Sequence, residues 1–156
     1  MTTVTWVKPT REHIEVLAVN MRPDEVKEIW ASGNLTPIDA LVKGVKASHG
    51  CTAAVIDGEP VAILGLVEGD LLSGRGCPWM LTSNSILKHR REVLRCSPPV
   101  IAEMLRHCSH IGNYVHADNK ISIRWLKWLG FTFEDPAPYG YEGEMFHYFY
   151  KESSSV

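Results

Sequence analysis

The chain has 156 residues, of which 45% are hydrophobic and 22% are charged, and its formal net charge is −2. This length and balance predict one globular domain with a sizeable core and exclude a disordered or fibrous protein. The small net charge does not require a nucleic-acid partner or an anionic membrane, and no apolar run approaches the ~20 residues that span a bilayer. We expect a cytoplasmic protein with a single domain over residues 1–152, a disordered tail over 153–156 and no secretory signal.

The first quarter of the chain predicts a short strand followed by three helices. Thr10 and Thr36 are of the type that caps helix N-termini, and Pro23 and Pro37 suit the first helical position. Gly33 is the predicted stop of the second helix. We therefore expect a strand over 3–7 and helices that begin near residues 10, 23 and 37.

A meander of three strands follows. Residues 51–56 and 60–67 are predicted strands, and Asp57-Gly58 between them is a typical hairpin turn. The second strand is apolar at nearly every position, so we expect it to be central in the sheet and covered on both faces. After a polar, glycine-rich loop, residues 77–82 are the third predicted strand.

The C-terminal half alternates helices and strands. Ser83–Ser97 is basic and predicted to be mostly helical, and Pro98-Pro99 predicts the start of a new helix. A strand over 111–116 and a short helix come next, and the last strand is predicted over 141–151.

The short helix after residue 116 carries signals at both ends. Asp118 or Asn119 can cap its start, and Gly130 supplies a left-handed stop, after which Phe131 packs back. The predicted apolar face is formed by residues at helical spacing, with Leu126 and Leu129 widening it: Ile121, Trp125 and Trp128.

The four cysteines have no spacing that indicates chemistry. None of them forms a close Cys-x-x-Cys pair, so neither a metal site nor a redox motif is predicted. We expect free thiols in a reducing compartment and no metal. The cysteines are Cys51, Cys77, Cys96 and Cys108.

Residues 111–133 resemble the closing motif of the GNAT superfamily of acyl-CoA-dependent N-acyltransferases. That motif has an Asn, two variable residues, an Ala or Ser, and a short helix that ends in Gly-Phe. Asn119, Ser122 and Gly130-Phe131 stand at these positions. The segments Asn113-Tyr114-Val115 and Ile123-Arg124 resemble segments in a phage branch of the superfamily. This branch includes acetyltransferase-like proteins of tailed phages and an internal virion protein of short-tailed phages. A looser resemblance covers residues 60–150.

The resemblance implies an α/β (α+β) fold with a mixed, mostly antiparallel twisted sheet and helices on both faces. Strands four and five, here 78–82 and 111–116, would splay apart. Acetyl-CoA would lie in the gap, where unpaired backbone groups bind its pantetheine arm as they would bind an added strand. The residues that the resemblance assigns to the cofactor are Leu81, Thr82, Asn119 and Ser122. The plainer alternatives are an ordinary core strand for the first two and a helix cap for Asn119.

The turn after the fourth strand departs from the family pattern. Family members have a glycine-rich turn whose amides hold a pyrophosphate, whereas residues 83–92 contain no glycine. Basic side chains would bind the phosphates by charge instead, and the alternative is a solvated basic turn. These side chains are Lys88, His89, Arg90 and Arg91.

Two catalytic groups have to be found for an acetyl transfer. A base must deprotonate the attacking ammonium, and Glu68, Asp70 and His116 follow predicted strand ends that face the gap. His116 suits the task because an unperturbed imidazole titrates near neutrality; the alternative is a surface histidine and a pair of loop acids. Many family members use a tyrosine as the acid, but Leu126 stands at its position. The tyrosines that would substitute for it are Tyr114, Tyr139 and Tyr141.

Two functions stay open. The first is an acetyl-CoA-dependent N-acetyltransferase in which an amine (a protein lysine, an N-terminus or a small molecule) attacks the thioester directly. The second is a catalytically degenerate GNAT-fold phage protein with a virion, assembly or host-modulating role, located in the host cytoplasm or the virion. The glycine-free turn and Leu126 favour the second function, whereas the resemblance to the superfamily favours the first. We expect acyl-CoA and an amine as partners, no membrane or nucleic acid, and a homodimer as one arrangement.

Overall fold

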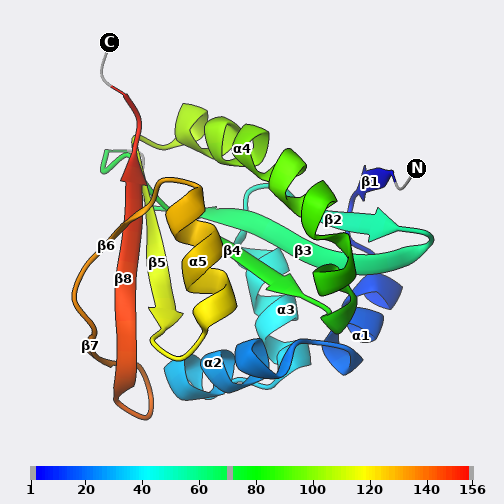
Figure 1. Cartoon of the computed structure of the whole chain (residues 1–156), viewed down its shortest axis with the longest axis horizontal. Helices are drawn as coiled ribbons and strands as arrows, with labels where there is room; N and C mark the ends of the chain where they lie inside the picture. The colour runs from blue at the N-terminus through cyan, green and yellow to red at the C-terminus, as the bar shows by residue number, and fades with distance from the viewer. Residues whose placement is uncertain (1–2, 70–71, 155–156) are drawn as a thin grey trace.

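The computed structural model describes residues 3–69 and 72–154. Asp70, one of the candidate bases, and the last two residues of the predicted tail lie outside this range. Over the described chain, eight strands form one sheet in the order β1-β2-β3-β4-β5-β8-β6, with β7 beside β8 (Figure 1). The sheet is antiparallel except between β4 and β5, which are parallel.

The elements follow the predicted order, with two further short strands before the last. The strands are β1 (Val4–Val7), β2 (Cys51–Ile56), β3 (Glu59–Glu68), β4 (Arg75–Thr82), β5 (His110–His116), β6 (Thr132–Phe133), β7 (Ala137–Tyr139) and β8 (Glu144–Glu152). The helices are α1 (Arg11–Val19), α2 (Pro23–Gly33), α3 (Pro37–Ala47), α4 (Arg90–His107) and α5 (Lys120–Trp128), and a 3-10 helix η1 (Asn84–His89) precedes α4. None of the described helices has both the length and the apolarity needed to cross a membrane.

Strand β3 is the centre of the core, as its apolar sequence predicts. Ile63 on one face packs in a cluster with Leu17 of α1 and Leu41 of α3. Leu64, on the other face, packs in a cluster with Leu126 of α5 and with Met104 of α4. The alternation of side chains along a strand therefore buries both faces of the sheet under helices (Figure 1).

Local signals at the helix ends explain where α1 to α3 start and stop. Thr10 forms a capping box with His13, and the Thr36 hydroxyl accepts a hydrogen bond from the Asp39 amide. The predicted stop of α2 is wrong by one residue, because Gly33 is still helical and Asn34 adopts the left-handed conformation, with φ of 54°. Asparagine tolerates this conformation because its short polar side chain bonds locally.

The predicted helix start at Pro98-Pro99 is wrong, since both prolines lie inside α4. A proline has no N–H, so the carbonyls of Leu94 and Arg95 receive no helical bond from them. These residues are exposed, and water can satisfy their carbonyls. The preceding turn is held by the Ser97 hydroxyl, which donates to the Val93 carbonyl.

Helix α5 is capped as predicted, but only part of its predicted apolar face, namely Trp125, Leu126 and Leu129, is turned to the core. The Asn119 side chain accepts from the Ser122 amide, and Gly130 closes the helix with φ of 92°. Ile121 and Trp128, predicted to be inward, are 42% and 55% exposed. The inward row contains Leu126 with Ile123, Trp125 and Leu129. An amphipathic pattern with apolar residues on most sides does not fix the buried face, and the contact with β5 and β8 selects it.

Strands β4 and β5 part along their length, as the resemblance implies. Their register contains two pairs, Arg75 with His110 and Gly76 with Ile111. Further along, the Asn113 side-chain amide bridges the strands by donating to the Pro78 carbonyl at 2.9 Å. Beyond that bridge the two strands diverge towards their C-terminal ends (Figure 1).

Candidate functional site

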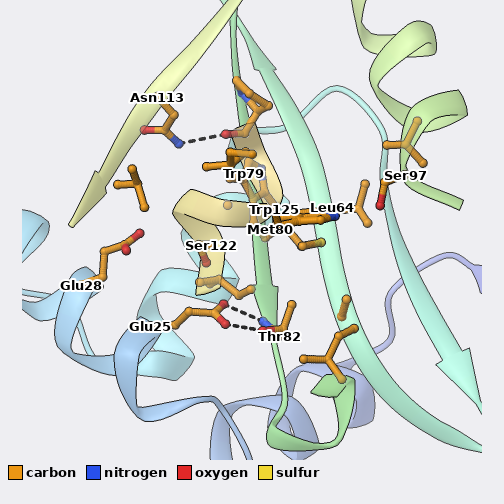
Figure 2. A pocket seen from close by; sticks show the side chains of 18 of the residues that line it. Glu25, Glu28, Leu64, Trp79, Met80, Thr82, Ser97, Asn113, Ser122 and Trp125 are labelled. Carbon is orange, nitrogen blue, oxygen red and sulfur yellow. Dashed lines mark hydrogen bonds between the residues drawn. The ribbon is translucent and has the colours of Figure 1, made fainter. Parts of the chain in front are cut away.

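A cavity of about 640 Å³ lies where β4 and β5 diverge. Its walls come from both sides of the sheet: α2 and α3 contribute one side, and α4 and α5 contribute the other. Figure 2 shows some of the side chains that line it, with Glu25 and Glu28 reaching in from α2 and Ser122 and Trp125 from α5. The cavity is therefore open to a ligand that passes between the two strands.

Helix α2 joins the ends of the diverging strands through two carboxylates. Glu25 Oε1 accepts from the Thr82 amide at the end of β4, at 2.8 Å. Glu28 Oε2 accepts from the His116 amide at the end of β5, at 3.2 Å. Residues three apart share one face of a helix, so a single turn of α2 holds both strand ends and keeps the gap open.

Glu25 is neutralised by a buried cation. Arg22 Nε lies 2.7 Å from Glu25 Oε2 and also donates to the Thr82 hydroxyl, and the Thr82 hydroxyl donates to Glu25. Arg22 Nη2 donates to the Ser122 hydroxyl at 3.0 Å, which connects α2 to α5. Burial raises the pKa of Glu25, and the Arg22 charge opposes the rise. These bonds connect Arg22 and Glu25 with the end of β4 and with α5, so the cluster is a structural link between these elements.

Glu28 has two hydrogen-bond donors but no comparable ion pair in the described chain. Its Oε2 accepts from the Asn119 side-chain amide at 2.9 Å as well as from the His116 amide. Burial raises the pKa of Glu28 to about 7, although both donors act to lower it. A carboxyl group on a cavity wall that titrates near neutrality can exchange a proton with a bound ligand.

The edge of β4 that faces the gap carries unpaired backbone groups at Met80. The Pro78 carbonyl points away from β3, since it accepts from Asn113, and the Thr82 amide and carbonyl also point away, towards Glu25 and the Arg22 amide. Backbone direction alternates with period two along a strand, so Met80 between them also faces the gap. Leu81 lines the cavity, but its backbone groups face β3.

Asn119 and Ser122, the two residues of α5 and its cap that the resemblance assigns to the cofactor, lie in the cavity wall. The Asn119 side chain is fully engaged, because its oxygen caps α5 and its nitrogen holds Glu28. The Ser122 hydroxyl accepts from Arg22 and retains its own proton to donate. The Thr82 amide, predicted to bind pantetheine, is taken by Glu25.

Two of the three candidate bases, Glu68 and His116, do not line the cavity, and the third, Asp70, lies outside the described residues. Glu68 pairs with Gly76 at the closed end of the gap, because β3 runs antiparallel to β4 and ends where β4 begins. His116 is buried outside the cavity: its Nε2 lies 2.7 Å from a Glu144 oxygen, and its Nδ1 accepts from the Asp118 amide. The structure thus brings neither side chain into the cavity between β4 and β5.

The basic turn after β4 has its first amides occupied. The amides of Ser83, Asn84 and Ile86 donate to the carbonyls of Val61, Asn20 and Ser83, in that order. A cradle of free amides is thereby excluded at those three positions. The basic side chains themselves stand on η1 and at the start of α4, all exposed except for a half-buried His89: Lys88, His89, Arg90 and Arg91. Phosphate binding by their charge stays a prediction.

Two of the three candidate tyrosines reach the cavity. Tyr114 and Tyr139 line it and stack on each other, with ring centroids 3.6 Å apart. Tyr141 is 66% exposed and does not line it. Leu126, at the family's tyrosine position, is buried in the wall. Burial raises the pKa of Tyr139, which keeps this phenol protonated.

The sequence pattern did not single out Glu28, because acids on an amphipathic helix are normally solvated. One local signal was present: Arg22, Glu25 and Glu28 recur at intervals of three, which places them in one row along α2. These charged residues lie next to the apolar residues Val26 and Ile29, which face the core. This position indicates that the charged side chains are buried as well. What the row contacts depends on β4 and β5, and no local pattern contains that information.

Comparison with known proteins identifies the fold. No protein-family model and no curated protein matches the sequence significantly. Solved structures do match. They include a Bacillus subtilis acetyltransferase in complex with CoA (TM-score 0.67, 9% identity, 99% of this chain and 100% of the other) and the Escherichia coli ribosomal-protein-S18-alanine N-acetyltransferase (0.68, 11%, 100% and 96%). The Vibrio cholerae spermidine N-acetyltransferase in complex with CoA and spermine also matches (0.69, 9%, 96% and 95%). The chain thus has the acyl-CoA N-acyltransferase fold of these GNAT acetyltransferases.

Proposed function

We propose that this chain is an acetyl-CoA-dependent N-acetyltransferase that acts on an amine. The observation that carries the proposal is the cavity between β4 and β5, which combines a free strand edge at Met80 with the Glu28 carboxyl group in its wall. Structural neighbours that are in complex with CoA, or that are named as N-acetyltransferases of a ribosomal-protein-S18 alanine or of spermidine, support it. The acceptor is a protein N-terminus, a protein lysine or a small amine.

The free edge of β4 fits the pantetheine arm of acetyl-CoA. The arm contains amides, which a strand edge binds through its backbone N–H and C=O groups. Met80 offers one such pair, and the Ser122 hydroxyl offers a further donor. Lys88, Arg90 and Arg91 carry the charges available to the phosphates, with His89 beside them. When bound, acetyl-CoA supplies the activated acetyl group.

The proposed chemistry assigns a role to each polar group of the cavity. Glu28 removes a proton from the ammonium, and the freed amine nitrogen attacks the thioester carbonyl carbon. A C–N bond forms, the C–S bond breaks, and the sulfur leaves as a thiolate. The pair Tyr114 and Tyr139 gives a proton to that sulfur, and the resulting phenolate takes up the second proton of the nitrogen, which leaves a neutral amide and a thiol. Asn119 is a positioning residue that acts through Glu28.

Acetyl-CoA binding is the first test. A ligand that binds only the folded state stabilises it by linkage, by about 2.7 kcal/mol at one hundred times Kd. We expect acetyl-CoA to raise the melting temperature and a panel of amines to release free CoA thiol, which a thiol reagent detects. Spermine, a peptide with N-terminal alanine and a lysine peptide represent the three acceptor classes. An unchanged melting temperature at millimolar acetyl-CoA would exclude the proposal.

A second candidate function is the catalytically degenerate phage protein with a virion, assembly or host-modulating role. Two observations favour it: the occupied amides of the turn after β4 and the buried Leu126 at the tyrosine position. This candidate predicts a folded protein that neither binds acetyl-CoA nor releases thiol. The melting experiment therefore separates the two functions before any acceptor is known.

A further inference from the structure

The cavity between β4 and β5 has a compartment on the side of α2 and α3. Trp79 of β4 packs there, in the cluster formed by residues of α1 and α3. Val115 of β5 packs on the opposite side with Met104 of α4. Successive side chains of a strand alternate between faces, so Tyr114 points to the side of α2 and α3. Glu28 reaches into the cavity from α2 (Figure 2), and the proposed base therefore meets an amine on this side.

The walls of this compartment are apolar and largely aromatic. Trp79 Nε1 donates to the Ser48 hydroxyl at 2.6 Å, which fixes the plane of the indole, whereas the buried Nε1 of Trp125 has no partner in the described chain. The stacked pair Tyr114 and Tyr139 lies across from Trp79 on β5 and β7. The remaining apolar wall comes from the segment after α2 and from α3: Leu35, Ala40 and Gly44.

The compartment can be reached from solvent. A Cβ at Gly44 would lie 2.8 Å from the Trp79 ring, so glycine is what lets the indole lie this close to α3. Tyr114 and Lys43 are exposed, and Trp79 is half-buried. A ligand that enters between α3 and β5 therefore contacts these rings before it reaches Glu28.

The charges of the cavity wall favour an acceptor with one ammonium group. Among the described carboxylates of the wall, Glu25 is paired with Arg22, and Glu92 stands on α4 at the other face of the sheet. Glu28 is left to receive the ammonium. Lys43 lines the wall from α3, and its charge repels any further cation. A polyamine would thus place its other ammonium groups beside apolar side chains and a lysine.

The apolar walls also disfavour a peptide. A peptide acceptor carries backbone N–H and C=O groups next to its reactive amine, and burying such groups without partners costs free energy. Leu35, Ala40 and Trp79 offer these groups no hydrogen bond, since the indole N–H is already bound to Ser48. An aromatic amine has no polar group besides its nitrogen.

We propose that the acceptor is a small primary amine with a single positive charge and an aromatic body, which lies between Trp79 and the pair of Tyr114 and Tyr139 while its nitrogen meets Glu28. The inference rests on the proposed function and selects one of its three acceptor classes. Aromatic rings pack on one another in offset or edge-to-face contacts, and they attract an ammonium to their faces. The compartment orients the nitrogen, and the bonds that form and break are those of the acetyl transfer.

Steady-state thiol release with matched amines tests the proposal. Phenylpropylamine and propylamine differ only in the ring, and spermine differs in its charge. At saturating acetyl-CoA we expect kcat/KM for phenylpropylamine to exceed that for propylamine about 10- to 100-fold, the effect of burying a phenyl ring. It should also exceed the values for spermine, for the peptide with N-terminal alanine and for the lysine peptide.

A charge reversal on α3 tests the role of Lys43. Lys43→Glu should raise kcat/KM for spermine about three- to tenfold more than that for phenylpropylamine, because spermine carries more positive charge. The matched control is Lys46→Glu, which makes the same change of net charge on the same helix at a side chain that does not line this cavity. Equal effects of the two variants on spermine would overturn the part of the inference that concerns charge.

The outcomes separate this inference from the proposed function. Equal kcat/KM for propylamine and phenylpropylamine, or a faster reaction of spermine or of either peptide, would overturn the inference while the thiol release upholds the transferase. No thiol release with any amine and an unchanged melting temperature with acetyl-CoA would overturn the proposed function as well. If Lys43→Glu does not fold, the selectivity of the wild type still decides.

Discussion

The ends of β4 and β5 are held by two glutamates of α2 that have different surroundings. At β4, Glu25 is paired with Arg22 and shares the hydroxyl and amide of Thr82. At β5, Glu28 has only neutral donors, from Asn119 and His116, and it faces the cavity. The difference shows that burial alone does not make a carboxyl group chemically useful. The Arg22 cation holds Glu25 in an ion pair that links α2 to β4. Glu28 has no such cation in the described chain, and its carboxyl group exchanges a proton near pH 7.

The largest expected effect comes from removing the proton acceptor at β5 while keeping its shape. Glu28→Gln retains an oxygen for the Asn119 and His116 donors but cannot take a proton. We expect the rate of acetyl transfer to fall about 10²- to 10⁴-fold, the usual contribution of a general base, with acetyl-CoA affinity unchanged. Steady-state thiol release and isothermal titration measure the two quantities. Asp24→Asn, an exposed substitution on the same helix, is the control, and a Glu28→Gln enzyme with the wild-type rate would remove Glu28 from the mechanism.

The corresponding substitution at β4, which removes the cation beside Glu25, should lower the free energy of unfolding. Arg22→Met leaves Glu25 buried without its cation, and removal of one partner of a buried ion pair costs about 3–5 kcal/mol. Urea denaturation at pH 7 measures the change. The double variant Arg22→Met/Glu25→Met removes both charges and should recover much of the loss. A single variant as stable as the wild type would show that the pair is not a structural link.

The pKa of Glu28 predicts opposite effects on stability and activity. Its folded pKa of about 7 lies above the ordinary 4.5, so the folded state binds the extra proton and loses stability as pH rises from about 4.5 to 7. Glu28→Gln should therefore be more stable than the wild type at pH 8, by about 1–3 kcal/mol, and indistinguishable at pH 4. Activity of the wild type should rise with pH through about 7. Melting curves and rates across pH 5–9 test both, and equal stabilities at pH 8 would contradict the raised pKa.

The smallest expected effect concerns the residue that serves both α5 and Glu28. Asn119→Ala removes a helix cap, which costs about 1–2 kcal/mol, and it removes a donor that lowers the pKa of Glu28. The midpoint of the pH–rate profile should move above that of the wild type. Asn119→Ser keeps a capping oxygen but no amide, so it should retain stability and still show the shifted midpoint. A midpoint that stays at the wild-type value in both variants would show that Asn119 does not influence the pKa of Glu28.

The fold could be predicted from sequence where the information is local. Thr10 and Thr36 cap helices through hydrogen bonds within three residues, and Asp57-Gly58 turns a hairpin through its own positive φ angles. The Asn119 cap of α5 was predicted for the same reason, since it bonds the Ser122 amide. Where a pattern allowed two outcomes, as for the prolines of α4 or the buried face of α5, tertiary contacts decided.

The candidate site depended on contacts that no local pattern encodes. Glu68 was favoured as a base because it ends a strand, but an antiparallel neighbour puts that end at the closed side of the gap.

The sequence by itself determined the order of the elements, the helix caps and the resemblance of residues 111–133 to a GNAT motif, because each depends on neighbours along the chain. Only the tertiary structure decided that Glu28 meets His116 and Asn119, residues 88 and 91 positions away, and that Trp125 Nε1 is left without a partner. The physical reason is that burial and proximity, which set both the pKa of a carboxyl group and the cost of an unpaired donor, arise from the path of the whole chain.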